Sequence, residues 1–427
     1  MANGLVIAAP RSGSGKTVLS LGLVAALRRR GLVIAAAKAG PDYIDTAMLG
    51  RAAGAEAVNL DAWAMAPERL RTIARDHAAG ADLLLVEGVM GLFDGAADGT
   101  GSTGDLAAHL GLPVILVVEA EKQAQSVAAL VMGFARFRAD VEVAGVILNR
   151  VATTKHERML TDALAPLGLP VLGAVPRRDG LALPSRHLGL VMPAEIAGFD
   201  AVVATAAELM EAYVDLTRLA ALSAPLRPPA AAPGRLPPLG QRLAIACDDA
   251  FCFLYPHLLA DWRAAGAELS FFSPLADESP KMNSDAVFLP GGYPELHGDR
   301  LSSAANFRSG LRAVRDAGAL LYGECGGYMV LGEALTDRAG VTHPMTGLLP
   351  ISTDISRPIR SLGYRRLTHV SPLPWPSRLY GHEFHYSTGG NAIHLFENSD
   401  SLGAKLPPLG AVVGRVMGSY AHVIDVA

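Results

Sequence analysis

A single cysteine, Cys325, stands between an apolar run and two glycines in the stretch ALLYGECGGYMVLG, residues 319–332. A buried strand that ends at a tight Gly-Gly turn exposes a thiol at its tip, where the thiol can attack a carbonyl carbon. The attack needs a base for the thiol proton and backbone N–H groups for the developing oxyanion. We therefore predict a thiol nucleophile, with oxyanion donors at the following glycines: Gly291 and Gly292 in FLPGGYPEL, and Gly326 after the cysteine.

The base that we predict for this thiol is His422, in the stretch GSYAHVID. His382 and His385, in GHEFHYS, compete for the role, although a histidine within a strand more often has a structural or substrate-facing role. Cys247 and Cys252 lie in apolar surroundings without a glycine elbow, which favours inert buried thiols.

More than 300 residues upstream, the stretch APRSGSGKT indicates a second site, one for phosphate groups. It joins an apolar strand to a helix, so backbone N–H groups of the loop at Gly13 and Gly15 can bind phosphate oxygens. Lys16 can reach the terminal phosphates and Thr17 can ligate magnesium. Pro10 replaces the first glycine of the strict GxxxxGK[ST] pattern, but the strand–loop–helix context still predicts a nucleotide site.

Three further apolar strands end in polar residues that belong to the same edge of the predicted sheet. Residues just beyond the carboxyl ends of parallel strands converge on a ligand crevice. A carboxylate directly after such a strand is the usual second magnesium anchor, which selects Glu87. For Asp42 and Asp45, helix capping is an equally good interpretation. The residues concerned are Lys38, Asp42, Asp45, Glu87, Asp94 and Asn149.

The elements that must position these residues form two α/β domains. Apolar runs alternate with helical segments up to about residue 215, which predicts a doubly wound parallel sheet in residues 1–222. Residues 223–240, SAPLRPPAAAPGRLPPLG, are proline-rich and predict a linker. The pattern restarts in residues 241–427 as a second α/β domain with an antiparallel tail.

The composition limits the classes of function. The chain has 427 residues, 50% hydrophobic residues and a net charge of -4, which indicate a folded protein with no bulk attraction for nucleic acid or anionic membranes. We find no apolar stretch of the roughly 18 residues that a membrane span needs, and no basic leader. Three cysteines indicate a reducing cytoplasm rather than a disulfide framework.

The motifs together carry a family resemblance. KAGPDYID after the GKT loop, followed by EGVMGLFDG, resembles the ATP-dependent half of the cobyrinic or hydrogenobyrinic acid a,c-diamide synthases, whose fold is shared with dethiobiotin synthetase. The cysteine, glycine and histidine stretches resemble the class I glutamine amidotransferase (flavodoxin-like) domain of the same family. The resemblance implies that Lys16, Thr17, Lys38, Asp42 and Glu87 handle ATP, Mg²⁺ and the transferred phosphate. It places Asn149 near adenine, and Asp45 and Asp94 near the carboxylate substrate.

The chain departs from the family pattern in two places. Many class I glutaminases carry a glutamate two residues after the histidine, but this chain has Ile424 there, and Asp425 is only a weak substitute. Leu254, His257 and Leu258 also replace residues expected in FCFLYPHLL. Arg11 stands where partition ATPases carry a signature lysine, and we interpret it as a solvated arginine.

The resemblance implies one reaction from two sites: amidation of the a and c acetates of a corrinoid with ammonia from glutamine, through acyl phosphates, in cobalamin biosynthesis. We expect a homodimer. Nickel-sirohydrochlorin a,c-diamide synthase and cobyric acid synthase are the alternatives within the same chemistry. A partition-type ATPase would share the phosphate loop but has no use for a glutaminase half, and a binding module derived from an amidotransferase would lack Cys325.

Overall fold

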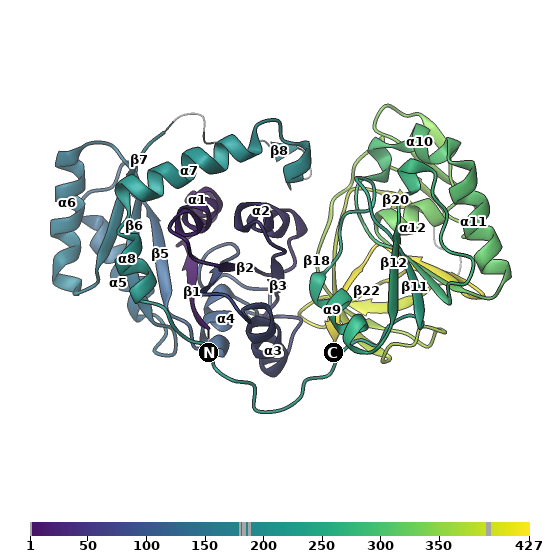
Figure 1. Cartoon of the computed structure of the whole chain (residues 1–427), viewed down its shortest axis with the longest axis horizontal. Helices are drawn as coiled ribbons and strands as arrows, with labels where there is room; N and C mark the ends of the chain where they lie inside the picture. Colours follow the sequence, from purple (N-terminus) through teal and green to yellow (C-terminus); the bar gives the residue numbers. More distant parts are fainter. Residues whose placement is uncertain (1, 179–180, 182–184, 187–188, 390–393) are drawn as a thin grey trace. The chain divides into compact units, whose positions relative to one another are not determined.

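The computed structural model describes residues 2–178, 181, 185–186, 189–389 and 394–427 (Figure 1). The chain divides into two compact units, Met1–Pro233 and Gly234–Ala427. The division falls inside the predicted linker. On one side of it, the backbone N–H of Ala230 bonds to Glu68 in the first unit. On the other side, Arg235 forms an ion pair with Asp261 in the second unit.

The first unit is built on a sheet of strand order β3-β2-β4-β1-β5-β6-β7, and the described ladders between these strands are parallel. The short strand β10 adds to β1 in the antiparallel direction. The strands are β1 Asn3–Ala8, β2 Ile34–Ala39, β3 Val58–Leu60, β4 Leu83–Glu87, β5 Val114–Glu119, β6 Val143–Val151, β7 Val171–Pro176 and β10 Ala224–Pro225, with a separate pair β8 Ser185–Arg186 and β9 Gly189–Leu190.

Helices cover both faces of this sheet, as the prediction of a doubly wound domain requires. Figure 1 shows α1, α2 and α7 on one side of the sheet and α3 and α4 on the other. Strands β2 and β4 are buried along their whole length, which explains their continuous apolar sequences. The helices are α1 Lys16–Arg29, α2 Tyr43–Ala53, α3 Pro67–His77, α4 Thr103–Leu110, α5 Ser126–Arg136, α6 Thr154–Leu164, α7 Phe199–Tyr213 and α8 Leu216–Ala221, with short 3₁₀ turns η1 Ala165–Leu167 and η2 Pro193–Glu195.

The second unit has a central sheet of order β12-β11-β13-β14-β24-β23, parallel except for the β23–β24 hairpin. Its strands are β11 Arg242–Ala246, β12 Glu268–Phe272, β13 Ala286–Leu289, β14 Leu320–Glu324, β23 Ala411–Val413 and β24 Val416–Ser419. The helices and turns of the unit are α9 Pro256–Ala264, α10 Gly298–Ser303, α11 Ala305–Asp316, α12 Gly326–Leu331, η3 Pro274–Ala276 and η4 Pro294–Leu296.

Two smaller sheets follow among the described residues of the second unit: one, of order β16-β15-β17-β20, is mixed, and the other confirms the predicted antiparallel tail. This other sheet has the order β22-β21-β18-β19-β25, with antiparallel ladders throughout. Its last strand carries His422, which lies opposite His382 of β19. The strands are β15 Ala334–Thr336, β16 Thr342–Pro344, β17 Ser352–Asp354, β18 Ser361–Thr368, β19 Arg378–His385, β20 Thr388–Gly389, β21 Phe396–Ser399, β22 Lys405–Leu409 and β25 His422–Val426.

Among the described residues, no helix combines the length and the apolar character that crossing a bilayer requires.

The α/β class of both units is as predicted. Strands β3 and β7 are not among the continuous apolar runs that predicted the sheet: β3 has only three residues, and β7, VLGAVP, is interrupted by a glycine at position 173.

Candidate active sites

The phosphate loop of the first unit has the backbone that its glycines predict. Gly13 and Gly15 have φ angles of 82° and 85°, which glycine adopts without steric cost. Gly15 precedes α1, whose first turn carries no acidic residue and no side-chain cap. The side-chain amide of Asn149, at the end of β6, donates to Ser14 O at 2.8 Å and so holds the loop. The backbone N–H groups at the start of α1 can therefore bind an anion.

Four predicted residues from four elements meet beside this loop. The Lys38 ammonium, on β2, lies 2.9 Å from Glu87 Oε1 at the end of β4 and 2.6 Å from Asp45 Oδ2 on α2. Thr17 Oγ1, on α1, donates to the same Glu87 oxygen at 2.8 Å. Burial lowers the pKa of Lys38, but Glu87 and Asp45 outweigh it and raise the pKa overall. Lys38 therefore stays charged in this buried cluster.

Lys16 lies at the same end of the sheet. Its ammonium donates to Met90 O at 3.0 Å, in the loop that follows β4. Burial, followed by the charge of Lys38, lowers the pKa of Lys16 to about 8. An anionic ligand would restore the charged form, since an opposite charge nearby raises the pKa of a lysine. Asp94 lies on the same loop, is exposed, and accepts from the backbone N–H of Gly91 at 2.9 Å.

Asp42 and Asp45 occupy different positions on α2. Asp42 is the N-cap, and its Oδ1 accepts from the backbone N–H of Asp45 at 2.7 Å, so the capping interpretation is confirmed for Asp42. Burial and the neighbouring Asp45 raise the pKa of Asp42 to about 6. Asp45 lies in the first helical turn but also contacts Lys38, so it is part of the charged cluster.

Magnesium can be tested against the carboxylates of this cluster. Glu87 Oε2 and Asp45 Oδ1 are buried oxygens without a hydrogen-bond partner among the described residues. Among the described residues, no three His, Cys, Asp or Glu side chains are grouped so that they could hold a metal ion by themselves. Mg²⁺ normally uses one or two carboxylates together with waters and substrate phosphates. The two oxygens and the Thr17 hydroxyl thus fit Mg²⁺ that arrives with a nucleotide.

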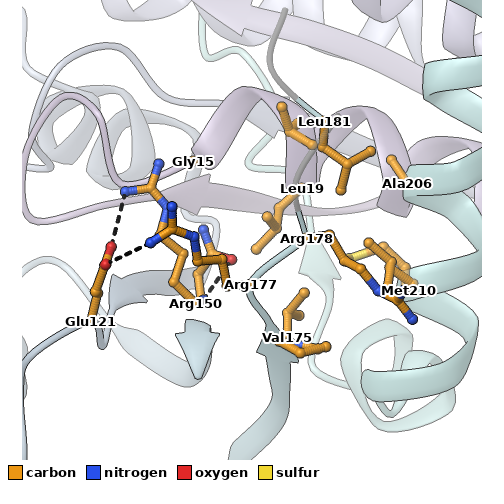
Figure 2. A pocket seen from close by; sticks show the side chains of 14 residues that line it. Gly15, Leu19, Glu121, Arg150, Val175, Arg177, Arg178, Leu181, Ala206 and Met210 are labelled. Atoms are coloured by element: carbon orange, nitrogen blue, oxygen red, sulfur yellow. Dashed lines mark hydrogen bonds and ion pairs between the residues drawn. The ribbon is translucent and has the colours of Figure 1, made fainter. Parts of the chain in front are cut away.

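A cavity of about 430 Å³ adjoins the phosphate loop (Figure 2). Its volume lies within the range of ligand pockets, about 300–1,000 Å³. One side is apolar and the other is charged, with Arg177 lying 3.0 Å from Glu121. Sequence reasoning missed these charged residues, although they lie at or just beyond the ends of β5, β6 and β7 and the same strand-end rule could have found them. The lining includes Gly15, Leu19, Glu121, Asn149, Arg150, Val175, Arg177, Arg178, Leu181, Ala206 and Met210.

Arg11 lies on the surface of this loop with 70% of its side chain exposed, as its interpretation as a solvated arginine predicts. It is not free, because its guanidinium lies 2.7 Å from the carboxylate of Glu119. Arg150 contacts the same carboxylate at 2.7 Å.

In the second unit, Cys325 forms a strained elbow between β14 and α12. Its φ of 47° and ψ of -107° are unusual for a residue with a side chain, and such strain concentrates at functional sites. The Cys325 backbone N–H donates to Ser419 O at 2.8 Å, which ties the elbow to the end of β24. The predicted sharp turn between a strand and a helix is therefore present at Cys325, although this residue is only 4% exposed.

The three predicted oxyanion glycines surround this elbow. A Cβ on Gly291 would lie 3.2 Å from the Cβ of Cys325, and a Cβ on Gly326 would lie 3.1 Å from the backbone nitrogen of Gly292. A Cβ on Gly292 would collide with Ala250 O. Side chains at these three positions would therefore crowd the elbow, which glycine avoids.

The three candidate histidines also meet at this place. A Cβ on Gly291 would collide with Cε1 of His422, so His422 packs against the same glycine as Cys325. The His382 ring lies 5.0 Å from the His422 ring, with Nε2 3.5 Å from Tyr255 OH. His385 Nε2 lies 3.1 Å from Glu383 Oε1, and its ring stacks on Tyr420. The geometry favours His422 as the base. His385 instead interacts with Glu383 and Tyr420.

The pKa shifts of Cys325 and His422 favour the uncharged form of both side chains. Burial, followed by the negative charge of Glu295, raises the pKa of the Cys325 thiol to about 12. Burial lowers the pKa of His422, and His382 and His385 lower it further. A neutral imidazole beside a protonated thiol can act as a general base during attack, rather than forming an ion pair beforehand.

A buried glutamate next to Cys325 was given no role in the sequence analysis, and burial raises its pKa to about 8. Glu324, the last residue of β14, has Oε2 3.9 Å from His422 Nδ1. Asp425, the weak candidate for an acid partner, instead accepts from the backbone N–H of Val426 at 2.8 Å. The sequence feature that could have drawn attention to Glu324 is its position at the end of an apolar strand, which the structure shows to be fully buried.

The remaining cysteines correct one expectation. Cys247 is exposed and Cys252 is half-buried, so the interpretation of both as buried thiols is wrong. The reason is that β11 ends at Ala246, and both cysteines lie in the connection between β11 and α9, where buried and exposed residues are mixed. His257 is buried, and its Nε2 lies 3.0 Å from Ile424 O.

Comparison with known proteins assigns a family to each of the two units. Residues 5–191 match the family described as CobQ/CobB/MinD/ParA nucleotide binding domain, and residues 242–425 match the CobB/CobQ-like glutamine amidotransferase domain. The relatives include three proteins named hydrogenobyrinate a,c-diamide synthase. The protein from Brucella abortus is 54% identical over 99% of this chain and 98% of its own length. Those from a Sinorhizobium species and Rhodobacter capsulatus are 52% and 48% identical, over 100% and 99% of this chain and 99% and 98% of their own lengths. With the nucleotide loop, the thiol elbow and this full-length similarity together, the chain belongs to the hydrogenobyrinate a,c-diamide synthase family of glutamine-hydrolysing amide ligases.

Proposed function

We propose that this chain amidates the a and c acetate carboxylates of hydrogenobyrinic acid, the metal-free corrinoid, with ammonia from glutamine and energy from ATP. The observation that carries the proposal is that one chain holds both the Cys325 elbow against His422 and the Lys38–Glu87 cluster beside a phosphate loop. The metal-free substrate is supported by the names of the relatives.

In the second unit, Cys325 attacks the side-chain amide carbon of glutamine while His422 accepts the thiol proton. The backbone N–H groups near Gly291, Gly292 and Gly326 stabilise the oxyanion. His422 then returns the proton to the departing ammonia, and water hydrolyses the thioester to glutamate. Because ammonia in neutral water is mostly ammonium, which is not a nucleophile, we infer that ammonia reaches the acceptor without exposure to bulk water.

In the first unit, the loop at Gly13 and Gly15 and the Lys16 ammonium bind the phosphates of ATP. Glu87, Thr17 and Asp45 have the oxygen atoms to hold Mg²⁺, with Asp42 as a further predicted ligand. When bound, Mg²⁺ would neutralise charge on the phosphates. Lys38 is held charged by its carboxylate partners and stabilises the phosphoryl group as it passes to the acetate carboxylate.

The cavity beside Gly15 suits the nucleobase, because it continues from the phosphate loop and is apolar on the side of Leu19 and α7. Asn149 lines this cavity, which supports its proposed contact with adenine. Its side-chain amide also holds Ser14, so a substitution there would disturb both the loop and the base. Asp94, exposed on the loop after β4, is the better placed of the two proposed substrate contacts, because Asp45 is engaged with Lys38.

We also infer a homodimer in a reducing cytoplasm. The three cysteines are free thiols, which suits a reducing compartment. Light scattering at several concentrations tests the oligomeric state, and a mass of one chain at all of them would refute the dimer.

The substrate is tested by mass spectrometry of products from hydrogenobyrinic acid and from cobyrinic acid, each with ATP, Mg²⁺ and glutamine. We expect a diamide from the metal-free substrate at a higher kcat/KM. A preference for the cobalt form, or for a nickel sirohydrochlorin, would refute the choice of macrocycle but not the amidation chemistry. Addition of more than two amides would instead support cobyric acid synthase.

A further inference from the structure

Three buried polar residues lie side by side near the carboxyl ends of neighbouring strands in the first unit. In the parallel ladders, Lys38 of β2 is paired with Glu87 of β4 on one side and with Asn59 of β3 on the other. Residues that are paired across neighbouring strands share a face of the sheet. The exposed fraction of each of the three is at most 2%. Asn59 is therefore the third member of a buried polar row that includes the lysine of the charged cluster.

The side-chain amide of Asn59 holds the turn that leads from β2 to α2. Its Nδ2 donates to Gly40 O and to Asp42 O, each at 2.9 Å. Gly40 has a φ of 82°, so the chain bends sharply directly after β2, and its backbone N–H donates to Leu60 O at 2.9 Å. The amide nitrogen of asparagine carries two hydrogens. One side chain of β3 thus fixes both ends of this turn.

The same turn sets the position of Asp45 on α2. Asp42 Oδ1 accepts from the backbone N–H of Asp45 at 2.7 Å, and Asp42 O also accepts from the Thr46 hydroxyl at 2.6 Å. Asp45 Oδ2 in turn lies 2.6 Å from the Lys38 ammonium. The contacts form a closed circuit, because Asn59 adjoins Lys38 in the sheet and reaches Asp45 through Asp42.

We propose that Asn59 is a positioning residue of the phosphoryl-transfer site. Its amide fixes the turn at residues 40–42, so that Asp45 stays against Lys38 and keeps its second carboxylate oxygen for Mg²⁺. The proposal rests on the function proposed above for the first unit. Asn59 exchanges no atom with the nucleotide or the acceptor, and it acts through the groups that it holds.

The chemistry of asparagine argues against a role in stability alone. Its Oδ1 is buried and has no hydrogen-bond partner among the described residues. A buried acceptor without a partner destabilises a fold. An amide is nevertheless the side chain that donates two hydrogen bonds here without adding a charge, whereas an arginine would compete with Lys38 for the carboxylates and an aspartate has no donor when ionised.

The test is Asn59→Ala, which removes both donors. Diamide formation from ammonium isolates the first unit, because it does not need glutamine. We expect kcat to fall about 10²-fold, since a 1 Å misplacement of a catalytic group can cost that much. The KM for ATP should stay within about 3-fold, because the phosphate loop and its cavity keep all their residues.

Binding of the non-hydrolysable analogue AMP-PNP, measured by titration calorimetry, gives a readout that does not depend on turnover. Its affinity without Mg²⁺ should be the same in Asn59→Ala as in the original enzyme. The gain in affinity on adding Mg²⁺ should be smaller, because the freed turn no longer holds the Asp45 carboxylate in place. A purely structural residue would change the amount of folded protein and not this gain.

The matched control is Asn398→Ala, in β21 of the second unit. Asn398 is also buried, its Nδ2 donates to Pro407 O, and its Oδ1 lacks a partner among the described residues. Both substitutions therefore remove a buried asparagine and should lower the melting temperature. Only Asn59→Ala should lower the ammonia-dependent kcat and the Mg²⁺-dependent gain in affinity.

Three outcomes would overturn the proposal: an original ammonia-dependent kcat in folded Asn59→Ala protein, equal losses of kcat in the two variants, or an unchanged gain in AMP-PNP affinity with Mg²⁺. If Asn59→Ala does not fold, Asn59→Ser decides by the same measurements, since its hydroxyl can donate to only one carbonyl and an original kcat there would refute the role. Absence of ammonia-dependent diamide formation in the original enzyme would instead refute the proposed function.

Discussion

The packing of Gly291 against His422 offers a steric test of the glutaminase site, Gly291→Ala. A Cβ on Gly291 would lie closer than 3.0 Å to Cε1 of His422, whereas ordinary contacts begin at 3.4 Å. The ring would therefore have to retreat by more than about 0.4 Å. The backbone is anchored, because Phe253 N donates to Gly291 O at 3.0 Å. Gly291 does not have a positive φ, so alanine suits the backbone, and crowding of His422 and of Cys325, whose Cβ would lie 3.2 Å away, is the expected cause of any loss.

The magnitude follows from how closely catalytic groups must be held. A site tolerates displacements of about 0.5 Å, and a 1 Å misplacement can cost about 10²-fold in rate. We therefore expect kcat for glutamate release to fall by between about 10-fold and 10²-fold. Diamide formation from ammonium at alkaline pH should stay near that of the original enzyme, since the clash lies in the second unit. Both rates can be measured in one preparation, with thermal unfolding as a check of folding.

The matched control is Gly133→Ala, within α5, where a Cβ would meet nothing within 4 Å. Alanine there should leave both activities unchanged and stabilise the helix by about 0.5–1 kcal/mol. Original glutaminase activity in folded Gly291→Ala protein would refute the placement of His422 against Gly291 and Cys325.

Three further predictions concern the two sites. Cys325→Ala should lose glutamine-dependent amidation and regain diamide formation with high ammonium, while Cys247→Ala should keep glutamine use; retained glutamine use in Cys325→Ala would place the nucleophile elsewhere. Glu87→Gln should stop amidation from both glutamine and ammonium and weaken Mg²⁺ binding, measured by titration calorimetry with ATP, because a neutral amide replaces a charged ligand and the partner of Lys38. Asp94→Asn should change the ratio of mono- to diamide products more than the KM for ATP, and Asp45→Asn should change both because Asp45 also contacts Lys38; an altered KM for ATP alone would assign Asp94 to the nucleotide.

Much of the fold was predictable because local sequence and tertiary structure agree. Runs such as ADLLLVEG are buried on both faces, which only the central strands of a covered parallel sheet require. The carboxyl ends of those strands share one sheet edge, so the position of Lys38 and Glu87 at the ends of their strands is enough to predict that they lie close together. Strand β3 escaped prediction because three residues carry too little periodicity to indicate a strand.

The chemistry of the residues was also determined by the sequence alone. A glycine at positions 13 and 15 permits the left-handed backbone of a phosphate loop, and the glycines around Cys325 leave room for an elbow. These requirements are local, because the residue type at each position decides by itself whether the backbone conformation and the space are available. The family resemblance rests on the same local motifs.

Only the tertiary structure decided which of these residues act together. Asn149 holds Ser14 across 135 positions of sequence, and Glu324 reaches His422 and Val423 across about a hundred. No local pattern relates such pairs, because their proximity depends on the order of strands in a sheet. Burial is decided at the same level: it leaves Cys247 exposed at the end of β11, shifts the pKa values of Cys325 and His422, and sets Asp45 rather than Asp42 against Lys38.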